Sequence, residues 1–454
     1  MKTPGKEDGL DRISVIGLGK LGLCIAAIFA YKGYQVVGVD IDEDKIRSVN
    51  EARAPFYEPG LDNLLRAVVP SGRVVATSDY SYAINDTDIT FVVVPTPSEP
   101  DGSYSNRYIG MAVKSIATEL RNKNQYHLIV ITSTVFPGTM EGLVRPLLEK
   151  YSGKKCVRDF GLCYNPEFIA LGSVIQDFLS PDLVLIGESD GYSGEMLAHL
   201  YRTVCENEPY IVRTTFINAE IAKIAINSFI TMKISFANTI AAICQRVPGA
   251  NVDEVLRAVG LDSRIGSKYL RGGLGYGGPC FPRDNRAFLC FARRYGFEGR
   301  LAEATDWINE RIPGEVVKMI EEVAAPSSEI VILGLTYKPG TYIVEESQAV
   351  TIARELASKG YKVLVHDPMG LSHAKRVLGT SVSYANSIDE CLARGDVLVL
   401  AVPWQEYVDR LSELKDRKQV TIIDCWRVIA HKRFPRNVRY IAWGVHEDAR
   451  AQSG

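Results

Sequence analysis

A cysteine thiol and an aspartate carboxylate lie four residues apart at the end of a stretch rich in glycine and proline, residues 272–284. The stretch contains five glycines and two prolines, a density that neither a helix nor a strand tolerates, so a loop is predicted. Cys280 would be a strong nucleophile as a thiolate, which a polar loop favours, and Asp284 would supply a nearby carboxylate. A small buried cysteine in a structural loop is the alternative, and this stretch alone supports both interpretations about equally.

A glycine pattern near the start of the chain predicts a second site. Gly17-Leu18-Gly19-Lys20-Leu21-Gly22 follows the β-branched run 12–16, and a later strand, 35–39, ends at Asp40. Strand, glycine turn, helix, strand and acid in this order are typical of dinucleotide-binding folds, because the glycines let the backbone approach a pyrophosphate at the helix N-terminus. Asp40 would accept hydrogen bonds from a ribose diol and repel a 2′-phosphate, so NAD is predicted rather than NADP. A glycine-rich turn without a ligand is the alternative.

Composition sets outer limits on the function. The 454 residues, 46% apolar and 23% charged, predict an ordinary globular protein of two or three domains. A net charge of −2 argues against a polyanion-binding surface, so no nucleic-acid partner is expected. The first nine residues are polar and no apolar run approaches membrane-spanning length, so no signal peptide and no membrane association are expected. Nine single cysteines without a CxxC pair, and six histidines without ligand spacing, favour reduced thiols in the cytoplasm and predict no metal site.

The elements that would position these residues follow an α/β pattern. Strands are predicted, with helical segments between most of them, at 88–94, 128–132, 160–164 and 183–186, which indicates a parallel sheet. Polar or special residues follow three of the strands, in the loops Pro95–Pro97, Ser133–Thr139 and Asn165–Phe168. Loops that follow parallel strands share one edge of the sheet, where ligands bind in such folds, so these three loops are predicted to form a site.

A long apolar helical pattern, residues 214–247, contains almost no glycine or proline. Lys223 and Asn227 lie four residues apart in it and so share one face of the predicted helix. The simpler interpretation of Lys223 is a surface lysine paired with Glu220 one turn earlier, and this helix alone favours that interpretation. Further helices are predicted at 251–259, 283–295 and 301–323.

An α/β pattern then begins again. Strands are predicted at 329–335, 362–366, 396–402 and 420–424, with a helix at 347–359. The first turn, 336–341, lacks the Gly-x-Gly-x-x-Gly pattern, so a different nucleotide, if any, is expected there. The predicted fold class is α/β, with two Rossmann-like doubly wound parallel-sheet domains joined by an all-helical central domain. The expected boundaries are 1–11 for a polar tail, 12–212, 213–312 and 313–454. A long helix between such domains often forms a dimer surface, and a substrate is expected between the domains.

Taken together, these residues resemble the nucleotide-sugar dehydrogenases of the UDP-glucose/GDP-mannose dehydrogenase family over residues 12–424, nearly the whole chain. Besides the glycine pattern with Asp40, and Lys223 with Asn227, the shared motifs are Tyr57-Glu58-Pro59-Gly60-Leu61, Pro95-Thr96-Pro97, Ser133-Thr134-Val135-Phe136-Pro137-Gly138, Asn165-Pro166-Glu167-Phe168, Ser263-Arg264-Ile265-Gly266, Gly277-Gly278-Pro279-Cys280-Phe281-Pro282-Arg283-Asp284, and Lys338. Chance agreement of all of these in order is negligible, so the simpler interpretations of Cys280 and Lys223 lose their support.

The resemblance implies an NAD-dependent oxidation of the C6 alcohol of a nucleotide sugar to a carboxylate, with UDP-glucose as the leading substrate and UDP-glucuronate as the product. Cys280 would add to the C6 aldehyde to give a thiohemiacetal and then a thioester, which water hydrolyses. Lys223 and Asn227 would stabilise the oxyanion. Asp284 would act as a base or orient the water, Glu167 would assist proton transfer and hydrolysis, and Thr134 would hold a water or the sugar.

The resemblance also implies binding roles. The residues expected to bind NAD are Gly17, Gly19, Lys20, Leu21, Gly22, Asp40, Lys45, Thr96 and Thr134. The residues expected to bind the nucleotide sugar are Glu167, Phe168, Lys223, Asn227, Arg264, Tyr269, Gly277 and Lys338. Lys338 would contact the nucleotide. Arg264 would reach the sugar in the neighbouring subunit's site, which implies a homodimer or a higher homo-oligomer.

Three positions depart from the family's pattern. Leu171 stands where the family carries a second glutamate, Leu183 where it carries an arginine, and Glu345 where it carries an arginine expected near the cofactor phosphates. The first change is expected to affect thioester hydrolysis. The last reverses a charge and is expected to weaken anion binding unless another cation compensates.

Other functions stay open at this point. GDP-mannose, a UDP-N-acetylhexosamine or an unusual nucleotide is the alternative substrate. A sugar-nucleotide-binding protein without turnover is the alternative of a different class, and the presence of Cys280, Lys223, Asn227 and Asp284 together argues against it.

Overall fold

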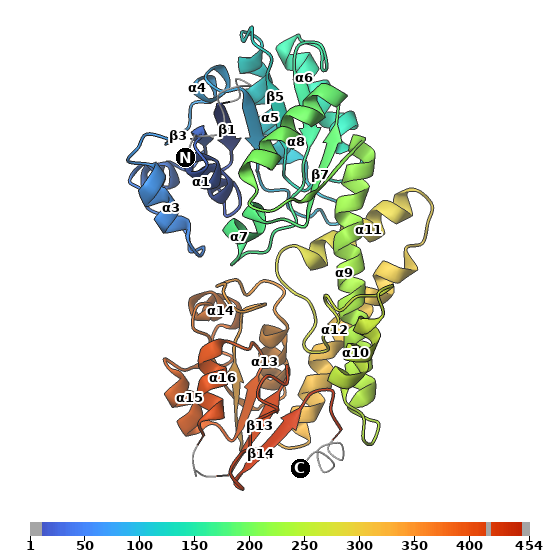
Figure 1. Cartoon of the computed structure of the whole chain (residues 1–454). Helices are drawn as coiled ribbons and strands as arrows, with labels where there is room; N and C mark the ends of the chain where they lie inside the picture. The colour runs from blue at the N-terminus through green and yellow to red at the C-terminus, as the bar shows by residue number, and fades with distance from the viewer. Residues whose placement is uncertain (1–10, 415–418, 447–454) are drawn as a thin grey trace. The chain divides into compact units, whose positions relative to one another are not determined.

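The computed structural model describes residues 11–414 and 419–446. The chain divides into two compact units, residues 1–225 and 226–454, here called unit 1 and unit 2. The boundary falls inside α9 (Phe216–Cys244), which is one continuous helix (Figure 1). Of the polar tail predicted at 1–11, all but the last residue lies outside the described residues. Within the described ranges, no helix is both long enough and apolar enough to cross a membrane.

Unit 1 contains an eight-stranded sheet in its described part. Its strands are β1 (Arg12–Ile16), β2 (Gln35–Val39), β3 (Val74–Thr77), β4 (Ile89–Val92), β5 (Leu128–Ile131), β6 (Gly161–Tyr164), β7 (Leu183–Glu188) and β8 (Tyr210–Thr214). Its helices, besides the start of α9, are α1 (Gly22–Tyr31), α2 (Glu43–Asn50), α3 (Leu61–Val68), α4 (Tyr80–Asn85), α5 (Arg107–Leu120), α6 (Arg145–Ser152), α7 (Val174–Leu179) and α8 (Gly191–Val204), with the π-helix η1 (Met140–Val144) before α6.

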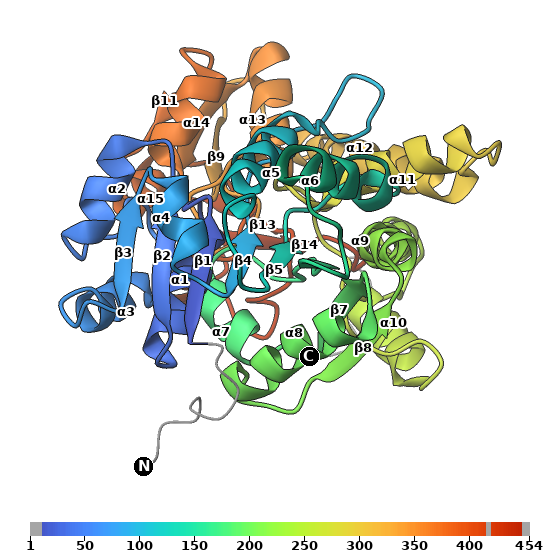
Figure 2. The same ribbon diagram turned by 90° about the horizontal axis from the view of Figure 1, so that it is seen from above.

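The strands of unit 1 lie in the order β3-β2-β1-β4-β5-β6-β7-β8. β1 pairs in parallel with both β2 and β4, so the direction of winding reverses beside β1. Helices α1, α7 and α8 cover one face of the sheet, and α4, α5 and α6 cover the other (Figure 2). Strands covered on both faces need apolar side chains on both, which is why runs such as Ile89–Val92 are buried throughout. The doubly wound arrangement was predicted.

One strand pair departs from the expected parallel order. β7 pairs with β6 in the antiparallel sense, with Cys163 opposite Glu188, and β8 then follows β7 in parallel. The segment between β6 and β7 therefore leaves and re-enters the sheet at the same edge. A parallel crossover would have to return along the whole length of the strands, and α7 with its six residues is too short for that return.

Unit 2 begins with helices and ends with a second sheet. Its elements, after the larger part of α9, are α10 (Val252–Leu261), α11 (Phe281–Arg294), α12 (Arg300–Glu321), β9 (Glu329–Leu333), α13 (Gln348–Ser358), β10 (Lys362–His366), α14 (Leu371–Leu378), β11 (Ser383–Tyr384), α15 (Ile388–Arg394), β12 (Val397–Leu400), α16 (Gln405–Ser412), β13 (Val420–Asp424) and β14 (Val438–Ala442).

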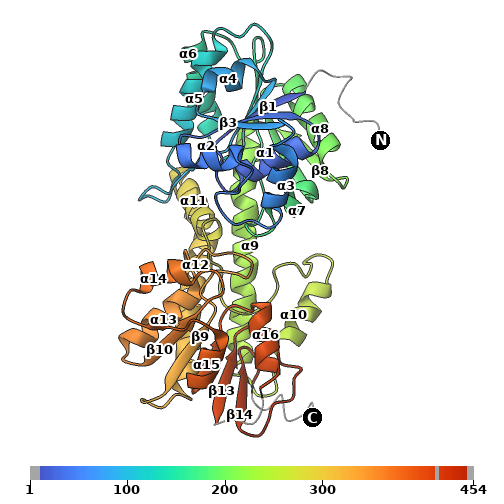
Figure 3. The same ribbon diagram turned by 90° about the vertical axis from the view of Figure 1, so that its left-hand side faces the viewer.

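The six strands of the sheet described in unit 2 have the order β11-β10-β9-β12-β13-β14, and every pair is parallel. Helices α12, α13 and α14 contribute to the core on one face. Helices α15 and α16 pack on the other face (Figure 3). The two Rossmann-like sheets and the helical region between them were thus predicted from sequence.

The strands that were not predicted are the edge strands of the two sheets: β3 and β8 in unit 1, β11 and β14 in unit 2. β8 is nowhere fully buried and β3 alternates between buried and exposed residues. An edge strand is covered less completely than a central one, so it lacks the continuous apolar run by which the inner strands were identified.

Candidate active site

The turn between β1 and α1 has the geometry of a phosphate-binding loop. Gly17 has a φ of +98°, and a Cβ there would lie 2.4 Å from the carbonyl oxygen of Val93. A Cβ at Gly22 would lie 1.9 Å from the carbonyl oxygen of Gly17, so neither position has room for a side chain. A Cβ at Gly19 would meet no atom within 4 Å, so this backbone borders open space. The open space beside Gly19, Lys20 and Leu21 lies at the start of α1, as a pyrophosphate site requires.

Asp40 closes this turn from the end of β2. Its Oδ2 accepts from the Leu18 N–H at 2.8 Å and pairs with Lys45 Nζ at 2.9 Å, while Oδ1 accepts from the Asp42 N–H at 3.1 Å. Burial opposes the charge on Asp40, but the hydrogen bonds from Lys45 and from the two N–H groups outweigh it and hold the pKa of Asp40 below its ordinary value. The carboxylate is therefore ionised at neutral pH and able to accept from a hydroxyl group.

The loops after β4 and β5 are joined by hydrogen bonds. Thr96 Oγ1 donates to the carbonyl of Thr134 at 2.8 Å. The Val94 N–H donates to Ser133 Oγ at 2.8 Å, and the same hydroxyl lies 2.7 Å from the Val94 carbonyl, to which it donates. Because β4 and β5 pair in parallel, both loops leave the sheet at one edge, as predicted. The two expected binding residues, Thr96 and Thr134, are held together there.

Glu220, near the start of α9, fixes the end of the loop after β5. Its two carboxyl oxygens accept from the N–H groups of Gly138 and Met140, both at 2.8 Å. Glu220 is 1% exposed, and this burial raises its pKa to about 7 despite the backbone hydrogen bonds, which lower it. The carboxylate thus serves the loop backbone, and the interpretation of Glu220 as the partner of a surface lysine is wrong.

Lys223 lies one turn further along α9 and points to the loop after β6. It is 5% exposed, so it is not a surface lysine. Its Nζ donates to the main-chain carbonyl of Glu167 at 2.8 Å and lies 4.7 Å from the centre of the Phe168 ring, a cation–π contact. A cation held in this way is a fixed positive charge beside the loop that the sequence assigned to the substrate.

Glu167 is the acid of that loop, and a tyrosine that sequence analysis missed touches it. Tyr201, in α8, places its hydroxyl oxygen 2.7 Å from Glu167 Oε1 and 2.5 Å from Asn165 Oδ1. Burial raises the pKa of Glu167 to about 7, while the charge of Lys223 lowers it. A carboxyl group with this pKa exchanges protons near neutral pH, as a general acid or base must.

Leu171 stands at the position where the family carries a second glutamate. Its side chain is half-buried and packs against the core that includes α1 and α7. The adjacent backbone is held by Glu58, whose carboxylate accepts from the N–H groups of Gly172 and Val174, both at 2.9 Å. The Tyr57–Leu61 motif therefore has a structural task in unit 1: Glu58 fixes the backbone that follows Glu167.

In unit 2, Cys280 occupies the N-cap position of α11 and is exposed. The helix begins at Phe281 with Pro282 in its first turn, two residues earlier than the sequence predicted, because proline fits the first turn of a helix where no N–H partner is needed. The Asp284 N–H donates to the Cys280 carbonyl at 2.8 Å and closes that turn. A thiolate at a helix N-terminus is stabilised by the helix dipole, so this placement suits a nucleophile.

Asp284 is fully buried and links Cys280's helix to α9. Its Oδ2 accepts from Asn227 Nδ2 at 2.6 Å, and its Oδ1 pairs with Arg283 Nε at 3.1 Å. The Asn227 side chain is thus oriented by a carboxylate that stands four residues after the thiol. Three of the residues assigned to catalysis, Asn227, Cys280 and Asp284, lie together in unit 2.

The glycine-rich stretch before Cys280 is fastened by two side-chain amides that the sequence did not single out. Gln348 Oε1 accepts from the Gly275 N–H at 2.7 Å, and Asn309 Oδ1 accepts from the Tyr276 N–H at 2.8 Å. Asn309 Nδ2 returns a bond to the Tyr276 carbonyl at 3.1 Å. A Cβ at Gly275 would lie 2.0 Å from Asn309 Oδ1, so the glycine is needed for this close approach.

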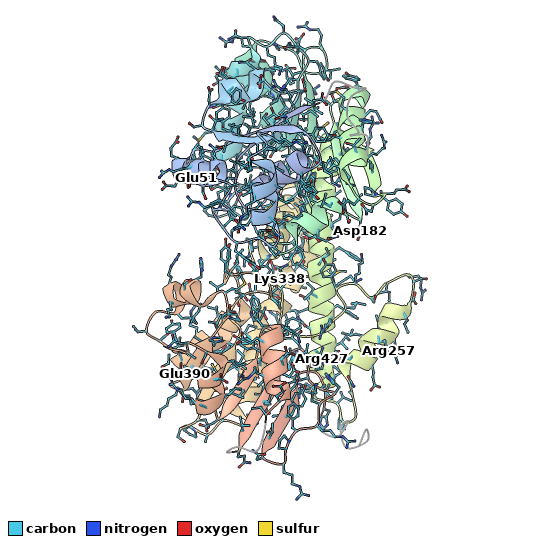
Figure 4. All side chains as sticks on the ribbon, turned by 60° about the vertical axis from the view of Figure 1, so that its left-hand side comes forward. Glu51, Asp182, Arg257, Lys338, Glu390 and Arg427 are labelled. Atoms are coloured by element: carbon cyan, nitrogen blue, oxygen red, sulfur yellow. The ribbon has the colours of Figure 1, made fainter. Side chains whose placement is uncertain are left out.

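Two further contacts hold the ends of this stretch. Arg427 is buried in unit 2 (labelled in Figure 4). Its guanidinium donates to the Gly272 carbonyl and forms two hydrogen bonds with Asp253, at 2.8 and 3.0 Å. The Gly278 N–H donates to the Glu345 carbonyl at 3.0 Å, and a Cβ at Gly277 would lie 2.3 Å from the Glu346 carbonyl oxygen. Hydrogen bonds therefore hold the loop that presents Cys280 at both ends and in its middle.

A pocket in unit 2 borders the same stretch at the carboxyl edge of the second sheet. Its lining includes Gly275, Gly277, Thr336, Tyr337 and Trp426. Lys338 follows Tyr337 in the loop after β9 (Figure 4), and its Nζ lies 6.0 Å from the Tyr337 ring centre. The pocket has room for about one water molecule, and Lys338 is not among its lining residues.

Glu345, which stands where the family carries an arginine, has a cation near it in the structure. Glu346, next in the chain, pairs with Arg286 of α11 at 2.9 Å and has a φ of +52°. Arg286 is thus a cation beside this segment, six residues after Cys280. Two other assigned residues are exposed. Arg264 pairs with Asp262 at 2.6 Å, and the Tyr269 ring lies edge-on to Phe281 at 6.3 Å.

No group of histidine, cysteine and acidic side chains in the described ranges could hold a metal ion.

Unit 1 brings together three sets of assigned residues: Asp40 with Lys45, Thr96 with Thr134, and Glu167 and Phe168 with Lys223. Unit 2 brings together Asn227, Cys280 and Asp284.

Comparison with known proteins gives a match along the whole fold. Three models of the UDP-glucose/GDP-mannose dehydrogenase family match the chain: the NAD binding domain at residues 11–205, the central domain at 217–311, and the UDP binding domain at 331–431.

Individual proteins are similar over almost the full length. UDP-glucose 6-dehydrogenase AglM of Haloferax volcanii is 37% identical over 423 residues, 92% of this chain and 97% of that protein. GDP-mannose 6-dehydrogenase of Pseudomonas aeruginosa is 34% identical over 424 residues, 90% of this chain and 95% of that protein. The solved structure of a UDP-glucose dehydrogenase from Pyrobaculum islandicum is 35% identical, with a TM-score of 0.88 over 97% of this chain and 99% of that one.

Proposed function

Because the chain belongs to the UDP-glucose/GDP-mannose dehydrogenase family, whose members are NAD-dependent nucleotide-sugar 6-dehydrogenases, we propose that it oxidises UDP-glucose to UDP-glucuronate. The observation that carries this proposal is the cluster in unit 2, where a nucleophilic thiol at a helix N-terminus lies four residues before a buried carboxylate bonded to an asparagine. The 37% identity with a named UDP-glucose 6-dehydrogenase supports the choice of sugar nucleotide.

Unit 1 has the residues to hold NAD. Gly19 borders the open space at the start of α1, and Asp40 has acceptor capacity for a ribose hydroxyl. Thr96 and Thr134 lie at the same edge of the sheet as the glycine turn. When bound, the nicotinamide accepts a hydride in each of the two oxidations.

The chain's own nucleophile would link the two oxidations. After the alcohol carbon has lost a hydride and its oxygen a proton, the Cys280 sulfur forms a bond to the aldehyde carbon, and the oxygen takes a proton to give a thiohemiacetal. Loss of the second hydride and of that proton leaves a thioester. Water then forms the new C–O bond, the C–S bond breaks, and the thiol and a carboxylate are released. A covalent adduct keeps the aldehyde from leaving between the two steps.

The roles of the residues around the nucleophile depend on the negative charge that develops on the substrate oxygen. The oxygen on C6 is negative when a tetrahedral adduct forms, so the ammonium group of Lys223 and the amide of Asn227 would stabilise it. Asp284 would hold Asn227 in place through the bond at 2.6 Å, besides acting as a base or orienting water. Glu167 would take and return protons, and Thr134 would hold a water or the sugar.

Several residues are proposed to bind the nucleotide sugar. Lys338 and Gly277 of unit 2 would contact the nucleotide, in the region that matches the family's UDP binding domain, and Phe168 of unit 1 would contact the sugar. Arg264 and Tyr269 are exposed. Arg264 would act toward a neighbouring subunit, and Tyr269 would bind the nucleotide sugar. GDP-mannose is the second candidate substrate, since a named GDP-mannose 6-dehydrogenase is 34% identical.

A homodimer is part of the proposal. The part of α9 in unit 2 exposes three large apolar side chains at seven-residue spacing: Phe229 (59% exposed), Phe236 (47%) and Ile243 (51%). Seven residues are close to two helical turns, so the three form one stripe, which suits a partner helix. Residues 12–212 would bind the cofactor, residues 213–312 would carry the nucleophile and the dimer surface, and residues 313–454 would bind the nucleotide. The protein would work in the cytoplasm.

The test is the number of NADH molecules formed for each UDP-glucose consumed by the purified protein. Two NADH with UDP-glucuronate as product are expected, and Cys280→Ser should reduce acid formation on the order of 10⁴-fold or more. The change should leave NAD binding intact, since the binding residues lie in unit 1. An unchanged rate in Cys280→Ser would overturn the covalent mechanism. Turnover with GDP-mannose but not UDP-glucose would replace the substrate.

A further inference from the structure

Asn165 and Tyr201 form a buried chain of hydrogen bonds that ends on Glu167. Tyr201 is 2% exposed and Asn165 is 1% exposed. Asn165 Nδ2 donates to the carbonyl of Leu185 in β7 at 2.9 Å, and Asn165 Oδ1 lies 2.5 Å from the Tyr201 hydroxyl. The same hydroxyl lies 2.7 Å from Glu167 Oε1.

The donors decide the direction of each bond in this chain. A backbone carbonyl accepts and never donates, so the Asn165 NH₂ group must face Leu185 and its Oδ1 must face Tyr201. Oδ1 also only accepts, so Tyr201 donates its single proton to it. The Tyr201 oxygen therefore presents a lone pair to Glu167. The contact at 2.7 Å is a hydrogen bond only when Glu167 carries a proton and donates it.

We propose that Asn165 and Tyr201 are positioning residues that keep Glu167 as a neutral acid, with its proton directed at Tyr201, until thioester hydrolysis requires the carboxylate. This rests on the proposed function, in which Glu167 takes and returns protons. An ionised Glu167 would face the Tyr201 lone pair. Otherwise Tyr201 would turn its proton away from Asn165 and leave a buried oxygen without a donor. Either way the chain disfavours the ionised form.

Three titratable groups from the surrounding elements face Glu167. Tyr201 of α8 acts as described, and Lys223 of α9 favours the ionised form, although its Nζ is bonded to the main-chain carbonyl of Glu167. Cys205, just after α8, stays a neutral thiol, because burial and then the nearby Glu167 raise its pKa to about 12. The neutral acid is thus favoured by burial and by the Asn165–Tyr201 chain, and opposed by one cation.

The test is a pH titration of Glu167 in the full-length protein by infrared spectroscopy. The protonated-carboxyl band is assigned by its loss in Glu167→Gln. In Tyr201→Phe the neutral acid loses its acceptor while the ionised form loses no donor, so the midpoint should fall by about one pH unit. A midpoint that rises would show that Tyr201 donates to the carboxylate and would overturn the proposal. An unchanged midpoint, or no protonated band in the wild type at pH 6, would overturn it too.

Asn165→Ala gives a second, independent reading. Without Oδ1 as acceptor, Tyr201 is released to donate to Glu167, which stabilises the carboxylate, so the midpoint should again fall. A constant midpoint here would mean that Asn165 does not direct the tyrosine proton. Tyr192→Phe is the matched control, since it removes a hydroxyl from the same helix at a residue that is 64% exposed, and it should change nothing.

Activity measurements separate this proposal from the proposed function. The pH dependence of kcat in Tyr201→Phe should shift by the same amount and in the same direction as the infrared midpoint. If Glu167→Gln forms two NADH per sugar at the wild-type rate, the catalytic role of Glu167 fails. The direction of the hydrogen-bond chain still stands or falls on the titrations.

Discussion

Gly17 after β1 and Gly334 after β9 occupy equivalent places in the two sheets. Both have a left-handed backbone, with φ of +98° and +94°. Both donate their N–H to the last carbonyl of the neighbouring strand, Gly17 to Val39 at 2.7 Å and Gly334 to His366 at 2.9 Å. Each glycine also lies against the next strand's end, where a Cβ would come within 2.4 Å or less of another atom. Up to this residue the two units build the same turn.

The similarity extends to the acid that ends the second strand. The Leu18 N–H donates to Asp40 Oδ2 at 2.8 Å, and the Leu335 N–H donates to Asp367 Oδ2 at 2.7 Å. Asp40 then receives two more donors, the Asp42 N–H and Lys45. The same position in a strand–turn–helix–strand unit thus carries a carboxylate in both sheets.

The next residue separates the two units. Unit 1 has Gly19, whose backbone borders open space, whereas unit 2 has Thr336, whose N–H and hydroxyl both donate to Asp367, at 3.1 and 3.2 Å. The N–H groups of Met369 and Gly370 add bonds at 2.9 and 2.6 Å, and the Trp404 indole adds one at 3.3 Å.

The two acids show that the same position can serve either a ligand or the fold. A carboxylate offers roughly four lone-pair positions. Asp367, with six donors, has no lone pair left for a ligand. It works as a strut for the turn after β9, meaning a buried carboxylate that holds backbone N–H groups in place. Asp40, with three donors, retains acceptor capacity for a ribose. At the place where unit 1 leaves the Gly19 backbone beside open space, unit 2 has a threonine that is bonded to its own acid.

Replacing the strut should produce the largest effect. Asp367→Ala leaves several buried donors without an acceptor, so we expect the free energy of unfolding to fall by about 4 kcal/mol. Urea unfolding measures this change. The matched control is Asp389→Ala, because this aspartate is 65% exposed and paired with Arg410 at the surface, and it should cost less than about 0.5 kcal/mol. A loss as small as the control's would show that Asp367 is not a strut.

Replacing the ligand acceptor should affect binding instead. Asp40→Ala removes the charged partner of the ribose, so we expect the Kd for NAD to rise about 100-fold, or about 2.7 kcal/mol. Titration calorimetry with NAD measures it, and the same experiment on a folded Asp367 variant, Asp367→Asn, should give a wild-type Kd. An equal rise in both variants would break the comparison between the two acids.

The sequence predicted the parts of this comparison that are local. Glycine spacing, strand patterns and Asp40 are close together in the chain, and the three family motifs around Glu167, Lys223 and Cys280 could be located without the fold. The structure was needed for contacts made across long separations. Tyr201 lies 34 residues after Glu167, Gln348 lies 73 residues after Gly275, and neither side chain carries a local signal.

The edge strands and the antiparallel β6–β7 pair were not predictable for a different reason. Partial exposure removes the continuous apolar pattern of β8, and strand direction depends on where the connecting segment runs, which hydrophobic periodicity does not encode.

Replacing Glu220 should produce the smallest effect. The replacement tests whether a buried acid that holds backbone N–H groups in unit 1 behaves like Asp367 in unit 2. Like Asp367, it is a buried carboxylate that holds backbone N–H groups, those of Gly138 and Met140. Its burial raises its pKa to about 7, above the ordinary value of a glutamate. The folded state therefore prefers the neutral acid, and its stability should decrease as the pH rises from below the ordinary pKa through 7.

Glu220→Gln keeps a neutral group of the same shape and removes the titration. We expect the variant to gain about 2 kcal/mol relative to the wild type between pH 5 and pH 8, measured as the change in the difference of their unfolding free energies. Comparing each protein with itself at two pH values cancels any fixed cost of the amide. A constant difference would mean that Glu220 is ionised throughout, as a strut saturated with donors would be, and the two units would then use their buried acids in the same way.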